Sequence, residues 1–74
     1  MNCRQFEIAR NTVINFVVNR SSFSLEELQN KILELGGVFL VSPGQTLDIY
    51  LKSFEKNGLI KYLPKTQSYE VLAS

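Results

Sequence analysis

The sequence predicts a single small α+β domain, mostly α, in which three helices are followed by a C-terminal β-hairpin. Two observations predict this. Apolar residues recur at three- and four-residue spacing over three separate segments, which is typical of helices with one buried face. The last segment instead alternates apolar and polar residues on either side of a polar turn, which is typical of paired strands. With 74 residues, the chain has room for one domain around one core.

The first helix is predicted over residues 6–19, where the polar segment 19–22 ends it. Its apolar stripe consists of Phe6, Ala9, Val13, Phe16 and Val17. Ile14 and Val18 lie to one side of this stripe, four residues apart, and Ile8 lies on the far side. Apolar residues outside the stripe can pack against a partner or a second copy of the chain, although single exposed apolar residues are also normal. A homodimer contact through Ile14 and Val18 is therefore one hypothesis.

The second helix is predicted over residues 25–35. Ser24 and Glu27 have the spacing of a capping box, in which each side chain binds the other residue's backbone N–H group. Phe23 and Leu28 have the spacing of a hydrophobic staple around the same cap. The predicted buried stripe is Leu28, Ile32 and Leu35, and the glycines at 36 and 37 end the helix. The apolar segment 38–41 fits either a short buried strand or an apolar loop.

The third helix is predicted to begin within residues 42–45. Ser42 fits the N-cap, Pro43 the first helical position and Gln45 the third. The predicted buried stripe is Leu47, Tyr50, Leu51 and Phe54. Asn57 and Gly58 form a stop signal, after which Leu59 can pack back on Phe54. The hairpin then follows as strands over 59–63 and 68–72, with a polar turn at 64–67.

The stretch SPGQTLDIYLKSFEKNGLI at residues 42–60 resembles the third helix and first wing strand of the winged helix-turn-helix DNA-binding superfamily, which includes small prokaryotic, archaeal and viral transcriptional regulators. In that pattern Thr46 opens the helix, Tyr50 and Leu51 are buried, and the Gly-Leu-Ile stretch at 58–60 begins the wing. The stretch 24–28 is similar to the start of the family's second helix. The link from Leu35 to Ser42 is longer than the turn of a compact helix-turn-helix.

This resemblance implies sequence-specific binding of double-stranded DNA and regulation of transcription, with the third helix in the major groove and the hairpin wing on the flanking backbone. At about 100° per residue, the helix side opposite Leu47, Leu51 and Phe54 carries polar and apolar candidates for this contact. Lysine holds phosphates, glutamine pairs with adenine, and an apolar side chain can meet a thymine methyl group. The expected DNA contacts are Gln45, Thr46, Ile49, Lys52 and Lys56 on the helix, and Lys65, Thr66 and Gln67 at the wing tip.

The net charge of +1 leaves a second hypothesis open. Strong DNA-binding proteins commonly carry a large positive excess, because phosphate contacts dominate their affinity. Here positive charge exceeds negative only before the second helix and after Ser42, while the second helix is acidic. The alternative is a winged helix that serves as a protein–protein interaction module without DNA binding.

Residue types that the chain lacks argue against catalysis. Without histidine, and with Cys3 as its one cysteine, the sequence has neither an ordinary zinc ligand set nor a Cys-His or Ser-His pair. We therefore expect no enzyme activity, no metal, no cofactor and no small-molecule ligand. The lone Cys3 fits a reducing cytoplasm, as a bystander thiol or as a link between two chains. The longest apolar run has four residues, so a cytoplasmic, non-membrane protein is expected.

Overall fold

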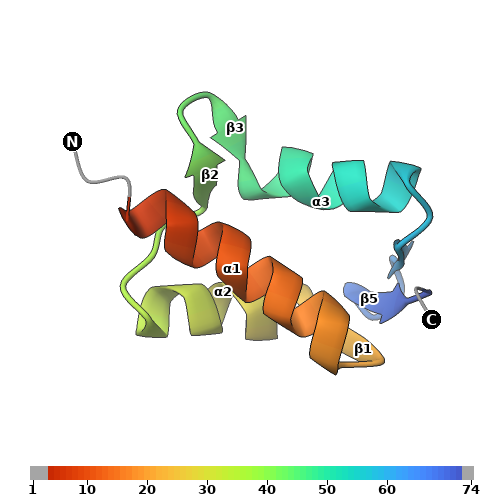
Figure 1. Ribbon diagram of the computed structural model, residues 1–74. Helices are drawn as coiled ribbons and strands as arrows, with labels where there is room; N and C mark the ends of the chain where they lie inside the picture. Colours follow the sequence, from red (N-terminus) through yellow and green to blue (C-terminus); the bar gives the residue numbers. More distant parts are fainter. Residues whose placement is uncertain (1–3, 73–74) are drawn as a thin grey trace.

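The computed structural model describes residues 4–72, which form a small α+β domain, about half of it helical, with antiparallel strands (Figure 1). The predicted α+β class, with three helices ahead of a C-terminal hairpin, is thereby confirmed for this part of the chain. Cys3 lies outside the described residues. In chain order the elements are α1 (Arg4–Asn19), β1 (Ser22–Ser24), α2 (Leu25–Glu34), β2 (Leu40–Ser42), β3 (Gln45–Thr46), α3 (Leu47–Lys56), β4 (Ile60–Leu63) and β5 (Ser68–Val71).

The strands form two antiparallel sheets. β4 and β5 are the predicted hairpin, and β1 pairs with β5 to complete a three-stranded sheet in the order β1-β5-β4. β1 was not predicted, because its three residues follow a polar segment that looks like a simple joint. It is held in place by residues far along the chain: Phe23 lies opposite Tyr69, and their rings stack with centroids 5.4 Å apart. The second sheet is the small β2–β3 hairpin.

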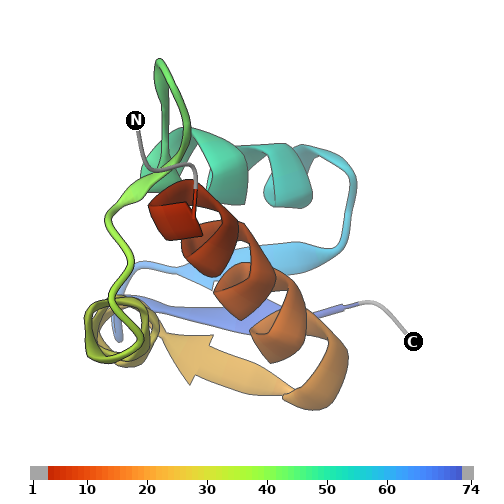
Figure 2. The same ribbon diagram turned by 60° about the vertical axis from the view of Figure 1, so that its left-hand side comes forward.

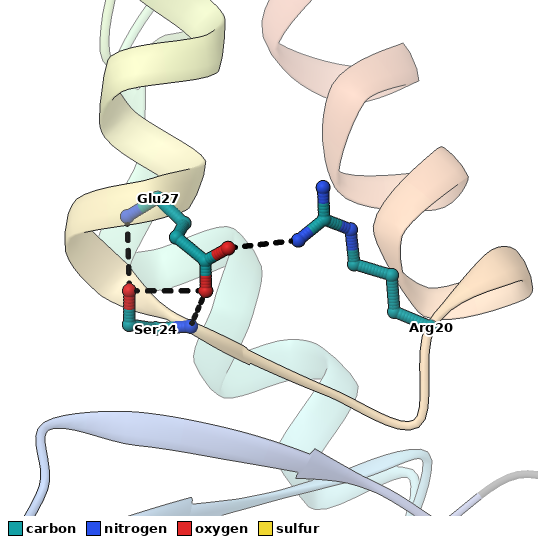
Figure 3. Close-up of polar contacts among 3 residues, drawn as sticks. All are labelled: Arg20, Ser24 and Glu27. Carbon is teal, nitrogen blue, oxygen red and sulfur yellow. Dashed lines mark hydrogen bonds and ion pairs between the residues drawn. The ribbon is translucent and has the colours of Figure 1, made fainter.

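The predicted capping box at the start of α2 is confirmed (Figure 3). The Ser24 hydroxyl accepts a hydrogen bond from the Glu27 backbone N–H at 3.0 Å, and the Glu27 carboxylate accepts one from the Ser24 N–H at 3.1 Å. The Arg20 guanidinium, at the end of α1, binds the other carboxylate oxygen at 2.9 Å. These contacts fix the turn between α1 and α2.

The predicted end of α2 is also confirmed. Gly36 adopts a φ of 87°, and the N–H groups of Gly36 and Gly37 donate to the carbonyls of Leu33 and Ile32 in a Schellman ending. Leu35, predicted to be buried, is instead 52% exposed. It is the C-cap residue, where the backbone leaves the helical path, so the helical spacing no longer places its side chain on the buried face.

The predicted start of α3 is wrong. Residues 42–45 do not begin a helix; they carry the turn of the β2–β3 hairpin, with Gly44 at a φ of 81°. The helix begins at Leu47, and Thr46 is its N-cap, whose hydroxyl accepts a hydrogen bond from the Ile49 N–H. Of the segment 38–41, residues 38–39 form a short link and residues 40–41 belong to β2, where Val41 is fully buried in the core.

One core joins all three helices and the three-stranded sheet. Its buried apolar residues are Ala9, Val13, Phe16, Phe23, Leu28, Ile32, Val41, Leu47, Leu51, Ile60 and Tyr69. Phe23, Leu28 and Leu51 are buried as expected, whereas Phe54 is half-buried at the margin. α3 and the β2–β3 hairpin lie at one end of the molecule, α2 and β1 lie at the other, and α1 runs between them (Figures 1 and 2).

Within residues 4–72, no helix is both long and apolar enough to cross a membrane.

Candidate nucleic-acid interface

The side of α3 that points away from the core carries three of the predicted contact residues. Leu47 and Leu51 are buried on the inner side of the helix. Ile49 is 51% exposed, and Lys52 and Lys56 are exposed as well. These three residues, here called the outer face of α3, share one side of the helix because they are three, four or seven positions apart. The structure therefore brings them together as the sequence predicted.

The acidic residues of α3 lie beside its outer face: Asp48 is four positions before Lys52, Glu55 is three positions after it, and both are exposed. Burial, together with the charges of Glu55 and Asp48, raises the pKa of Tyr69, on β5, to about 12. Lys52 therefore has acidic neighbours on the helix surface, whereas Lys56 and Ile49 lie further around it.

Gln45 is not on the helix where the sequence placed it, whereas Thr46 opens α3 as its N-cap. Gln45 lies in β3, half-buried, and its side-chain oxygen accepts a hydrogen bond from the Ser42 hydroxyl at 3.2 Å. Thr46 is exposed, and its hydroxyl is engaged as the cap of α3. Both residues adjoin the N-terminal end of α3, since the hairpin leads directly into the helix. The outer face of α3 therefore begins at Ile49, and Gln45 belongs to a separate element beside it.

The turn between β4 and β5 carries the other predicted contacts, Lys65, Thr66 and Gln67, all of them exposed. The turn is anchored rather than free. Gln67 adopts a φ of 51°, and its carbonyl accepts a hydrogen bond from the Leu25 N–H at 3.2 Å, at the start of α2. This bond holds the turn against α2, so the structure does not bring these residues onto the outer face of α3 (Figure 2). Sequence reasoning missed the anchor because it joins residues 42 positions apart.

α1 presents the two predicted dimer residues to solvent. Val18 is 73% exposed and Ile14 is 44% exposed. Ile8, predicted on the far side, is instead half-buried, because α2 and the backbone at Gly37 pack against it. Its neighbours Asn11 and Asn15 line an open groove between α1 and α2, with Leu35 on the opposite wall.

Comparison of the chain with protein-family models, curated proteins and solved structures finds no match. Among residues 4–72, no three or more acidic or cysteine side chains gather where they could hold a metal ion.

Proposed function

We propose that this chain is a winged helix-turn-helix protein that binds double-stranded DNA sequence-specifically and regulates transcription. In this proposal α3 enters the major groove, and the β4–β5 hairpin lies on the flanking backbone. The observation that carries it is the outer face of α3: two lysines and an exposed isoleucine oppose a fully buried stripe, on a ten-residue helix. The order of three helices followed by a hairpin supports the fold assignment.

The distribution of charge supports the same docking direction. Helix α2 carries three glutamates and one lysine, and it lies at the opposite end of the molecule from α3 (Figure 1). Asp48 and Glu55 are exposed on α3, beside Lys52. A duplex placed against the outer face of α3 would keep the three glutamates of α2 away from its phosphates. Segregation of this kind allows phosphate contacts in spite of a net charge of only +1.

The proposal is tested by titrating duplex DNA with the protein at several salt concentrations. The Lys52→Ala and Lys56→Ala variants are expected to weaken binding to all sequences alike and to lower the salt slope by about 1 each, because each loses one phosphate contact. Lys65→Ala is expected to act in the same way only on a duplex long enough to reach beyond α3 to the β4–β5 turn, because that turn is held against α2. Lys31→Ala is the matched control, since Lys31 lies on α2 and pairs with Glu34. Weak DNA binding that is unchanged by the substitutions of Lys52, Lys56 and Lys65 would contradict the proposal.

A second candidate is a protein-interaction module, and the exposed Val18 and Ile14 favour it. The simplest partner is a second copy of the chain, paired through α1. A homodimer is compatible with DNA binding, because it would double a modest basic face. If the contact exists, replacing Ile14 and Val18 with lysine converts a dimer to a folded monomer in sedimentation experiments. A wild-type protein that sediments as a monomer at high concentration removes the homodimer.

A further inference from the structure

We propose that the β2–β3 hairpin is a second DNA-contacting element, in which Gln45 reads the edge of a base and Ser42 holds its amide in position. The inference rests on the proposed function, because it concerns the same duplex docked against α3. It adds an element that lies outside the third helix and outside the β4–β5 hairpin.

The position of the hairpin is the first argument. In both views it rises beyond α3, on the side of that helix that faces away from α1 and the three-stranded sheet (Figures 1 and 2). A duplex that approaches the outer face of α3 therefore also meets the hairpin. The hairpin adjoins the N-terminal end of α3, so its contacts would lie next to those of Ile49.

The hairpin is also firmly held. Its Val41 side chain is fully buried, and the Val41 carbonyl accepts a hydrogen bond from the Arg10 guanidinium of α1 at 2.7 Å. At the base of the hairpin, the Leu47 N–H donates a hydrogen bond to the Phe39 carbonyl at 3.0 Å. An element fixed in this way loses little conformational freedom when it binds, so its contacts can discriminate between ligands.

The chemistry of the hairpin favours a base over a phosphate. Residues 40–46 include no charged side chain, and Gln45 is the one among them with an amide. A glutamine amide can accept from adenine N6 and donate to N7 in the major groove. The Ser42 hydroxyl lies 3.2 Å from the Gln45 side-chain oxygen, which has a second lone pair, while the amide nitrogen keeps its two donors. Ser42 is thus a positioning residue that leaves the adenine-reading groups available.

The test is selection of binding sites from randomised duplex DNA, followed by titration of the preferred site and of its single-base variants. Gln45→Ala is expected to lose roughly 5- to 150-fold in affinity at one adenine and to bind variants at that position alike. Its salt slope stays unchanged, in contrast to Lys52→Ala. Ser42→Ala is expected to lose less at the same base pair, and Ser42→Thr, which keeps a hydroxyl, is expected to restore the preference.

Thermal unfolding of each variant provides the control for folding. Should Gln45→Ala fail to fold, Gln45→Glu keeps the shape of the side chain but cannot donate to N7, so it must still lose the adenine preference. A Gln45 variant that folds and retains the wild-type base preference overturns the inference, as does a loss that is equal at every position. In either case a response to Lys52→Ala leaves the proposed function standing. A wild-type protein that does not bind duplex DNA overturns both.

Discussion

The N-terminal ends of α2 and α3 are secured in different ways. Each helix begins with a leucine that follows a hydroxyl N-cap, Ser24 before Leu25 and Thr46 before Leu47. The cap of α2 belongs to a reciprocal pair with Glu27. The cap of α3 has no such partner, because its third helical residue is apolar. Instead, the first residue of α3 is buried: Leu47 is only 2% exposed, whereas Leu25 is half-buried at the margin of the core.

The difference shows two ways to fix where a helix begins. The start of α2 is fixed by polar contacts on the surface, among residues close together in the chain. The start of α3 is fixed by the packing of Leu47 in the core, together with the hydrogen bond from the Leu47 N–H to the Phe39 carbonyl. Packing from inside leaves the outward positions of the first turn of α3 free of a stabilising role. An exposed Ile49 can stand where a capping box would require glutamate or glutamine, and that position is available for a ligand.

The largest expected effect is on the free energy of unfolding, and it differs between the first residues of the two helices, Leu47 and Leu25. Leu47→Ala is expected to lower the free energy of unfolding by about 2–5 kcal/mol, because it leaves a cavity in the core beside α3. Leu25→Ala, the same substitution at the same position of α2, is expected to cost clearly less, since its side chain is already partly in solvent. Urea unfolding of both variants measures the difference. Equal costs would show that the two helix starts do not differ in the way described.

Features that depend on neighbouring residues were predictable from the sequence. The capping box of α2, the glycine endings of α2 and α3, and the β4–β5 hairpin each depend on signals within a few positions of one another. At the end of α3, for example, the Leu59 N–H donates to the Phe54 carbonyl, as the stop at Gly58 predicts. Ile49, Lys52 and Lys56 were placed on one face correctly for the same reason, since the helical repeat alone decides it.

Features that depend on distant residues were not predictable. The segment from Ser42 to Gln45 fits a helix start, but Pro43 followed by Gly44 equally fits the centre of a type II turn. Local preference cannot decide between them. The bond from Arg10 to the Val41 carbonyl, 31 positions apart, supports the turn, and it moves Gln45 from the helix to the hairpin. β1 was missed likewise, because its partner Tyr69 lies far along the chain.

A smaller effect is expected at the caps themselves. Ser24→Ala and Thr46→Ala should each lower the free energy of unfolding by roughly 0.5–2 kcal/mol, because each leaves a backbone N–H without its partner. Ser24→Ala should cost more, since it also removes the hydrogen bond that the Ser24 hydroxyl donates to the Glu27 carboxylate. Glycine at either cap provides the control, because it keeps the extended cap conformation at a cost of only about a few tenths of a kcal/mol. A larger cost at Thr46 would contradict the comparison.

The smallest expected effect is a dependence of stability on pH that arises at the start of α2 and not at the start of α3. The hydrogen bond from the Ser24 backbone, with the Arg20 guanidinium beside it, holds the pKa of Glu27 below its ordinary value of 4.5. A carboxyl whose pKa is lowered by folding stabilises the protein above its unfolded value, and this contribution is lost as the pH falls through the lowered pKa. Glu27→Gln keeps a capping side chain but cannot titrate, so its stability should fall less than that of the wild type between about pH 5 and the lowered pKa.

The cap of α3 has no titratable partner, so it supplies the control for this measurement. The difference in stability between wild type and Thr46→Ala should be the same at pH 7 and in acid, because Thr46 and Ile49 do not ionise. The difference between wild type and Glu27→Gln should instead shrink as the pH falls. The other carboxylates titrate in every variant and cancel in each difference. A Glu27→Gln difference that is constant with pH would mean that the charge of the Glu27 carboxylate does not stabilise the start of α2.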